Sequence, residues 1–238
     1  KWEDSYLSSK SFVLVLGESY TGPVTVNLAH IPHILLGGST GSGKSVLLKL
    51  LLMQALHKDA EVYIADFKGG VDYPKVWHEK CRMCFTEEDL LYTLNQLVAV
   101  LEYRKKALKE LGSPNIDAYN ETTENKLPRL IFACDEVAEL LDRTGRGKED
   151  KERLAQIENK LATLARLGRA FGIHLILATQ RPDDVEAVCA RVAVLEAGRL
   201  RFVGAPGDMV NRAEGKVFLA DLPEEALPTL RRRYRVVS

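Results

Sequence analysis

Long apolar runs and an excess of one charge are missing from this 238-residue sequence, and cysteines are few. No run reaches about eighteen apolar residues, so no transmembrane helix is predicted. The 33 basic and 33 acidic residues cancel, and any nucleic-acid partner must therefore be held by a local basic surface. Four scattered cysteines argue against a disulfide framework and favour the cytosol. The first residues, KWEDSYLSSK, lack the charged and then apolar pattern of a signal peptide.

Apolar runs and helical stripes alternate along the chain, which is long enough for one large α/β domain or two small ones. Such alternation predicts a parallel sheet covered by helices on both faces. The predicted strands are 12–16, 24–28, 34–36, 62–65, 130–134 and 173–178, and the predicted helices are 44–57, 87–111 and 149–170.

A glycine-rich segment joins the strand at 34–36 to the helix that begins at Lys44. Its spacing, Gly38-x-x-x-x-Gly43-Lys44-Ser45, is that of a Walker A phosphate loop in the required strand–loop–helix setting. The glycines let backbone N–H groups point at phosphate oxygens, and the helix adds the positive end of its dipole. Lys44 would neutralise the β- and γ-phosphates, and Ser45 would bind magnesium. The alternative is a glycine-rich turn with a coincidental lysine. The predicted nucleotide-binding residues are Gly38, Ser39, Thr40, Gly41, Ser42, Gly43, Lys44, Ser45 and Val46.

Two carboxylates follow the apolar strand at 130–134, as in a Walker B strand. The strand would be buried in the sheet, and its end would bring Asp135 to the magnesium ion beside the phosphate loop. Glu136 would then orient and deprotonate the attacking water. A strand that simply ends in solvated acids is the alternative.

The strand at 173–178 ends in Thr179 and Gln180. In ATPases with a strand inserted between Walker A and Walker B, a polar side chain at that end lies next to the γ-phosphate. Gln180 is therefore the predicted sensor of the γ-phosphate, and an ordinary polar strand end is the alternative.

Four segments carry a resemblance to a known family: PHILLGGSTGSGKS (32–45), IADFKGG (64–70), CDEVAELL (134–141) and GRAFGIHLILATQRP (168–182). Together they resemble the FtsK/SpoIIIE family over about residues 12–182. That family comprises ring-forming DNA translocases, the coupling proteins of conjugative elements and the motors of type VII secretion. The modest helix and loop lengths look most like the conjugative coupling members.

The resemblance implies a RecA-like P-loop fold and ATP hydrolysis that drives movement of double-stranded DNA in conjugation or chromosome segregation. It further implies a ring, expected to be a hexamer, with ATP between subunits and an arginine supplied by the neighbour. By the family pattern this is Arg169, with Arg166 as second choice, although both could be solvated charges on a helix end. Asp66 and Lys68 match a family position and could serve loop structure or chemistry. A cytoplasmic location at the cell membrane, through segments not in this chain, is also implied.

The pattern changes after Pro182, where residues 184–238 resemble the tail of an ABC-transporter ATP-binding domain, with a strand, a tight turn at Gly198 and a return strand. The ABC signature run is absent, and the strand end at Gln180 lacks the catalytic histidine of ABC proteins. We therefore divide the chain into a β-rich lead-in, an ATPase core and a small β-rich tail that completes the domain, at 1–30, 31–182 and 183–238.

Protein export, as in type VII secretion, and an ABC-type transporter ATPase remain as alternative functions. His78-x-x-Cys81-x-x-Cys84 has the spacing of metal ligands but lacks a second cysteine pair, so an ordinary loop with two free thiols is favoured over zinc. The basic run 231–233 is either a solvated face or a contact to phosphates. His33 and His174 flank core strands and are expected to pack or to form hydrogen bonds.

Overall fold

The computed structural model describes residues 7, 12–19, 22–38, 41–141, 144–180, 192–196, 199–205 and 208. A five-stranded sheet with the order β3-β7-β6-β4-β5 lies at its centre, and every neighbouring pair is parallel. The parallel sheet predicted from the alternation of strands and helices is therefore confirmed. The strands are β3 (His33–Gly37), β4 (Glu61–Ala65), β5 (Arg82–Cys84), β6 (Leu130–Cys134) and β7 (Ile173–Thr179).

Alternate residues of the central strands pack into two separate cores, because successive side chains of a strand point to opposite faces. Ile131 and Ala133 of β6 join a cluster with Leu48, Leu51 and Leu52 of helix α1. Leu130, Phe132 and Cys134 join the cluster on the other face. The sheet is covered on both faces, so its central strand β6 is apolar and buried along its whole length.

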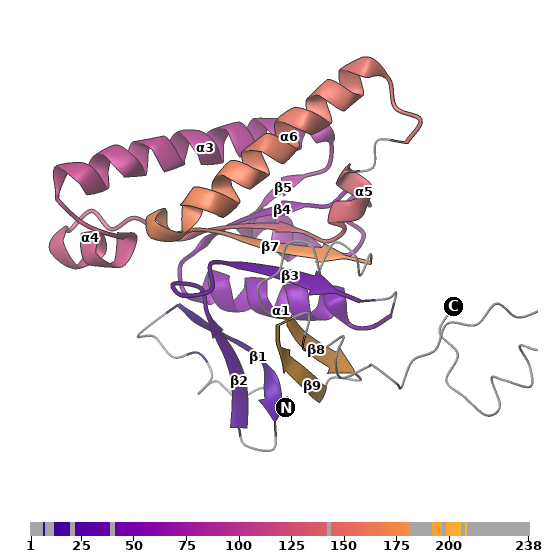
Figure 1. The fold of residues 1–238 in the computed structure, drawn as a ribbon, viewed down its shortest axis with the longest axis horizontal. Coiled ribbons are helices and arrows are strands. Elements are labelled where there is room, and N and C mark those ends of the chain that lie inside the picture. Colours follow the sequence, from indigo (N-terminus) through magenta and orange to yellow (C-terminus); the bar gives the residue numbers. More distant parts are fainter. Residues whose placement is uncertain are drawn as a thin grey trace, which may run out of the picture.

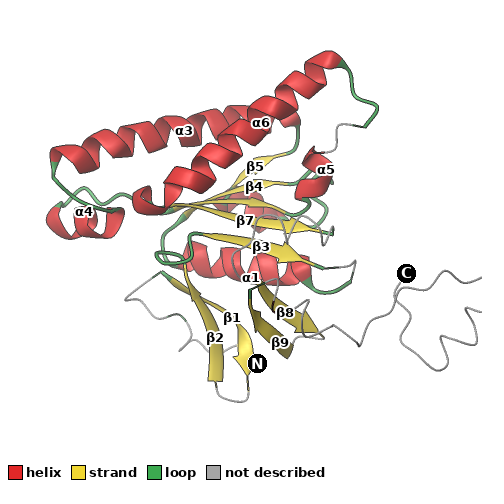
Figure 2. Cartoon of the chain, viewed as in Figure 1, coloured by secondary structure: helices red, strands yellow, loops and turns green. Residues whose placement is uncertain are grey.

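The two faces carry different helices (Figures 1 and 2). Helix α1 packs on one face, and the long helices α3 and α6 pack together on the other, which gives three layers. A capping box between Thr86 and Asp89 starts α3. Every third or fourth residue of α3 and α6 is buried along one stripe, and these residues are leucine or isoleucine except for Arg104 of α3. These helices are α1 (Lys44–His57), α3 (Glu87–Glu110) and α6 (Lys148–Leu167).

The helix predicted over 149–170 ends earlier, at Leu167, and continues as the 3₁₀ turn η2 (Gly168–Phe171). The chain turns back sharply here to enter β7. A Cβ atom at Gly168 would lie 2.4 Å from the carbonyl oxygen of Ile173, and Gly172 has a left-handed φ of +67°. This close return explains why the regular helix cannot extend to Ala170.

Four short elements were not predicted, because segments of this length carry too little periodicity for a helix or strand signal. One is β5 at the edge of the sheet. Another, α4, begins where the Asn115 side chain accepts a hydrogen bond from the backbone N–H of Ala118. The unpredicted helices are α2 (Lys75–Lys80), α4 (Ile116–Thr122) and α5 (Val137–Leu141).

The chain also forms two antiparallel hairpins outside the central sheet. In the first, the buried side chain of Gln54 in α1 bonds to both the backbone N–H and the carbonyl oxygen of Val15, at 2.7 and 2.9 Å. The second hairpin contacts the first through β9, and its two strands pair antiparallel as the prediction of a strand and a return strand requires. The turn predicted at Gly198 lies outside the described residues. The other features predicted for the C-terminal tail, including the basic run 231–233, also lie outside the described residues. The hairpin strands are β1 (Val13–Ser19), β2 (Gly22–Asn27), β8 (Val192–Glu196) and β9 (Arg199–Gly204).

None of the described helices is both long and apolar enough to cross a membrane.

Candidate nucleotide-binding site

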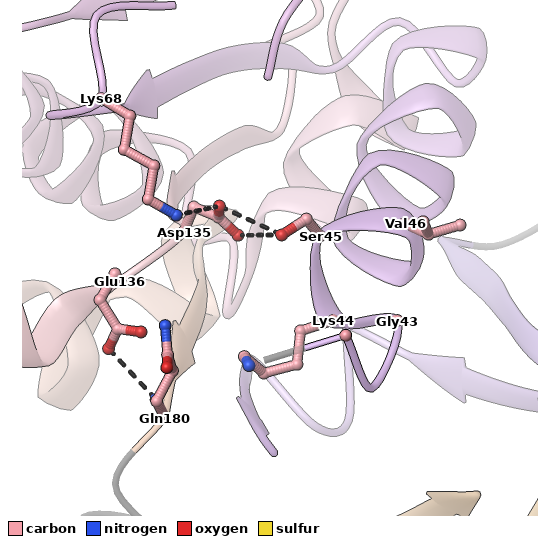
Figure 3. Close-up of a pocket in the computed structure, with 9 residues that line it drawn as sticks. Gly43, Lys44, Ser45, Val46, Lys68, Asp135, Glu136 and Gln180 are labelled. Carbon is pink, nitrogen blue, oxygen red and sulfur yellow. Dashed lines mark hydrogen bonds and ion pairs between the residues drawn. The ribbon is translucent and has the colours of Figure 1, made fainter. Parts of the chain in front are cut away.

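A cavity of about 260 Å³ opens at the edge of the sheet where its parallel strands end. The phosphate loop follows β3, the paired acids follow β6, and Gln180 follows β7. Because the carboxyl ends of parallel strands share one edge, these separate segments meet at the cavity (Figure 3). The residues that line it are Gly41, Gly43, Lys44, Ser45, Val46, Lys68, Asp135, Glu136 and Gln180.

The phosphate loop has the backbone geometry for which glycine is suited. Gly41 and Gly43 have φ values of +77° and +95°, in the left-handed region that side chains disfavour. At Gly38 a Cβ atom would lie 2.7 Å from Oγ of Ser42, so the Ser42 side chain would have to move to admit one. Two predicted members of the loop, Ser39 and Thr40, lie outside the described residues.

Lys44 and Ser45 begin α1 and project from the loop in different directions (Figure 3). The Lys44 ammonium donates a hydrogen bond to the Gly38 carbonyl oxygen, so it lies against the loop. The Ser45 hydroxyl lies 3.0 and 3.2 Å from the two carboxylate oxygens of Asp135. The start of α1 is thus joined to the end of β6 by one hydroxyl–carboxylate contact.

The Ser45–Asp135 pair fits a magnesium ion. A hydroxyl and a carboxylate are the hard oxygen donors that this ion prefers. Asp135 is 6% exposed, so its charge needs a cation nearby. The buried Tyr73 hydroxyl has no hydrogen-bond partner within the described part of the chain. Burial and then the charge of Asp135 raise the pKa of Tyr73. The pair could therefore hold the metal.

Glu136 and Gln180 lie beside each other at the ends of adjacent strands. The Gln180 backbone N–H donates to Oε1 of Glu136 at 3.2 Å, and Glu136 is buried while Gln180 is exposed. The order β3-β7-β6 places the strand of Gln180 between the strands of Walker A and Walker B. The inserted strand on which the sensor prediction depends is therefore present.

Lys68 lines the same cavity, although the sequence indicated only that its position matched a family pattern. Its ammonium nitrogen lies 3.6 Å from Oδ2 of Asp135. The carboxylate of Asp66, directly after β4, accepts the backbone N–H groups of Lys68 and Gly70 at 2.9 Å each. Asp66 therefore organises the loop. The sequence signal for a role of Lys68 at the cavity was that its strand, β4, ends at the same edge of the sheet as the phosphate loop.

The two candidate arginines do not reach this cavity. Arg169 is exposed in η2, before β7, and its Nε donates to the Ala29 carbonyl oxygen at 3.1 Å. Arg166 is exposed in the last turn of α6. Both lie at the amino end of β7, whereas the phosphate loop lies at the carboxyl end of the sheet. Either arginine could act only on the nucleotide of another subunit.

The two candidate histidines are held by hydrogen bonds in the core. Burial lowers the pKa of His33, whose Nε2 lies 2.8 Å from the Ala165 carbonyl oxygen. Burial, followed by the charge of Arg129, lowers the pKa of His174 to about 3. His174 is therefore neutral: Nδ1 donates to the Pro32 carbonyl oxygen and Nε2 accepts from Arg129.

The candidate zinc ligands each have another environment. His78 bonds to the Tyr73 carbonyl oxygen and Cys84 to the Thr93 hydroxyl, while burial raises the pKa of Cys81 to about 11. A thiol with a raised pKa is a poor source of the thiolate that zinc requires. The described residues contain no group of three or more potential metal ligands.

Comparisons of sequence place this chain beside known motor proteins. The sequence profile of the FtsK/SpoIIIE family matches residues 3–184. A DNA translocase FtsK of Treponema pallidum is 28% identical over 90% of this chain and 26% of its own length. The DNA translocase FtsK of Chlorobaculum tepidum is 31% identical over 74% of this chain and 23% of its own length. The chain thus spans about a quarter of the length of these relatives.

Comparisons with solved structures agree with the sequence comparisons. The monomer form of the pCW3 conjugation coupling protein TcpA, solved with ATPγS, is 40% identical with a TM-score of 0.73, over 76% of this chain and 52% of TcpA. The cytoplasmic domain of the type VII secretion ATPase EccC of Thermomonospora curvata is 26% identical with a TM-score of 0.56, over 73% of this chain and 22% of EccC. Of these two, the coupling protein shares more of both sequence and shape with this chain.

Proposed function

The chain belongs to the FtsK/SpoIIIE family and has its P-loop ATPase fold, and on that basis we propose that it is a motor domain whose ATP hydrolysis moves double-stranded DNA. Conjugation and chromosome segregation are the processes in which such a motor would serve. In a longer protein, segments outside this chain would hold it at the cytoplasmic face of the membrane.

One observation carries the proposal: the Ser45 hydroxyl bonds to Asp135, ninety residues away in sequence, at the mouth of the phosphate loop. This contact brings the predicted Walker A and Walker B segments together, which supports a site for metal-dependent nucleotide hydrolysis. Lys44 and the backbone N–H groups from Gly38 to Val46 would hold the phosphates. Ser45 and Asp135 would hold Mg²⁺, which would neutralise charge on the phosphate oxygens.

Glu136 is suited to the role of general base. Its carboxylate is buried beside the cavity, and its bond to the Gln180 backbone N–H fixes its direction. A carboxylate held in this way can orient a water molecule and accept its proton. The exposed side chain of Gln180 would contact the terminal phosphate, so that the end of β7 responds to hydrolysis.

We propose that a second subunit completes the site. Lys44 and Lys68 supply the positive charge within the described cavity lining, which contains no arginine. Phosphoryl-transfer sites commonly add an arginine that stabilises the transition state. Arg169 of a neighbouring subunit would supply it in a ring, expected to be a hexamer, with Arg166 as second choice.

Double-stranded DNA is favoured over protein as cargo, because the coupling protein TcpA shares 40% identity with this chain and the secretion ATPase EccC 26%. Trapping the ATP state tests this choice. The Glu136→Gln protein, loaded with ATP and Mg²⁺, should bind a fluorescent duplex more tightly than the same protein with ADP. That affinity should fall steeply as salt rises, since contacts to phosphates release counterions. Duplex affinity that is independent of both nucleotide and salt would point to another cargo.

A further inference from the structure

Lys68 adds positive charge to the cavity beside Asp135, and no specific partner for it has been assigned in the proposed reaction. It lies in the loop after β4, and its ammonium points across the cavity toward Asp135 (Figure 3). The nitrogen is 3.6 Å from Oδ2 of Asp135 and 4.0 Å from Oδ2 of Asp72. Both distances exceed those of a good hydrogen bond. The ammonium is therefore near two carboxylates without being fixed to either.

The backbone of Lys68 is held firmly while its side chain is not. Asp66, 2% exposed, accepts the backbone N–H groups of Lys68 and Gly70. The loop then turns through Gly69 and Gly70, which have φ values of +75° and +82°. The Lys68 side chain is 44% exposed, and its four-carbon stem can rotate. The ammonium can thus change partners without any movement of the loop.

Magnesium at Asp135 would force such a change. A carboxylate ligand lies about 2.0–2.1 Å from Mg²⁺, so an ion bound to Asp135 would lie close to the present position of the ammonium. The two cations repel each other strongly in a partly buried site. The nucleotide that arrives with the metal carries a terminal phosphate into the same cavity, which offers the displaced ammonium an anionic partner.

We propose that Lys68 is a second phosphate-binding lysine, which neutralises Asp135 in the nucleotide-free protein and transfers its ammonium to the γ-phosphate when the metal ion takes Asp135. This inference rests on the proposed ATP-binding function. It assigns different tasks to the two lysines: Lys44 belongs to the phosphate loop, whereas Lys68 reports whether a third phosphate is present. Lys68 would consequently make the site prefer ATP over ADP.

Nucleotide preference tests the transfer to phosphate. Lys68→Met removes the charge and keeps most of the length, Lys68→Arg keeps the charge, and Lys75→Met in the exposed helix α2 is the control for net charge. Titration calorimetry with Mg²⁺ should show that Lys68→Met loses about tenfold or more in affinity for ATP and less than about twofold for ADP. Lys68→Arg should keep most of the preference for ATP, and Lys75→Met all of it.

The response to Mg²⁺ alone, without nucleotide or turnover, tests whether the metal ion displaces the Lys68 ammonium from Asp135. Because the ammonium no longer competes, Mg²⁺ should raise the melting temperature of Lys68→Met more than that of the wild type. An equal loss of ATP and ADP affinity, or an unaltered response to Mg²⁺, would overturn the inference and leave the proposed function standing. If the wild type itself binds no nucleotide, the proposed function fails as well, so the two failures are distinguishable.

Discussion

Replacing Glu136 by glutamine should leave the site assembled and stop its chemistry. The amide oxygen of glutamine can accept the hydrogen bond that the Gln180 backbone N–H now donates to Glu136. The side chain should therefore keep its place, and the affinity for ATP should change little. What the amide cannot do is accept a proton from the attacking water.

The loss can be expressed as a free energy. General-base catalysis contributes a factor of about 10² to 10⁴ in rate, which corresponds to about 2.7 to 5.4 kcal/mol in the activation barrier. The substitution also replaces a buried charge, 7% exposed, by a neutral group of the same shape. The melting temperature should consequently stay unchanged or rise.

Phosphate release and calorimetric binding should be measured on the same preparations. The matched control is Glu136→Ala, which loses the proton acceptor together with the hydrogen bond to Gln180. The expected pattern is ATP affinity near that of the wild type for Glu136→Gln and turnover reduced at least about a hundredfold for both variants. Wild-type turnover in Glu136→Gln would refute the assignment of Glu136 as the base.

Three further predictions follow from the same geometry. Lys44→Ala should remove measurable ATP binding in calorimetry, since the phosphates lose their strongest partner; unchanged affinity would show that the loop is not the site. Arg169→Ala should bind ATP normally yet lose activity, and mixing it with Lys44→Ala subunits should restore part of that activity if the arginine acts on a neighbour's ATP; no recovery at any ratio would contradict this. Because burial lowers the pKa of His174 from 6.5 to about 3, the unfolded state takes up its proton first. The free energy of unfolding should then fall by up to about 1.4 kcal/mol per pH unit below pH 6.5, and denaturation of His174→Gln should lack that slope.

The sequence predicted most of the sheet because β4, β6 and β7 are largely apolar runs, each followed by a distinctive polar residue. Asp135 and Gln180 mark such ends, and parallel pairing then requires them to share an edge. The predicted parallel sheet and its helical layers are confirmed, as is the membership of the FtsK/SpoIIIE family. The roles of the individual site residues stay predictions.

What the sequence could not provide are contacts that depend on the assembled fold. Arg104 is buried in α3, where its guanidinium donates to the carbonyl oxygens of Pro128 and Phe171. Burial lowers the pKa of Arg104 to about 10. Arg129 likewise joins Asp117 to His174. Each of these partners is distant in the sequence, so no local sequence pattern predicts the contact. The position of the Lys68 ammonium beside Asp135 has the same origin.

Long double-stranded DNA added to an ATP hydrolysis assay tests the central claim most directly. The wild-type protein should release phosphate faster when duplex DNA is present, and the acceleration should weaken as salt rises. Lys44→Ala, with DNA and without it, gives the background. A hydrolysis rate that exceeds this background but is unchanged by DNA at every salt concentration would contradict the account of this chain as a DNA motor.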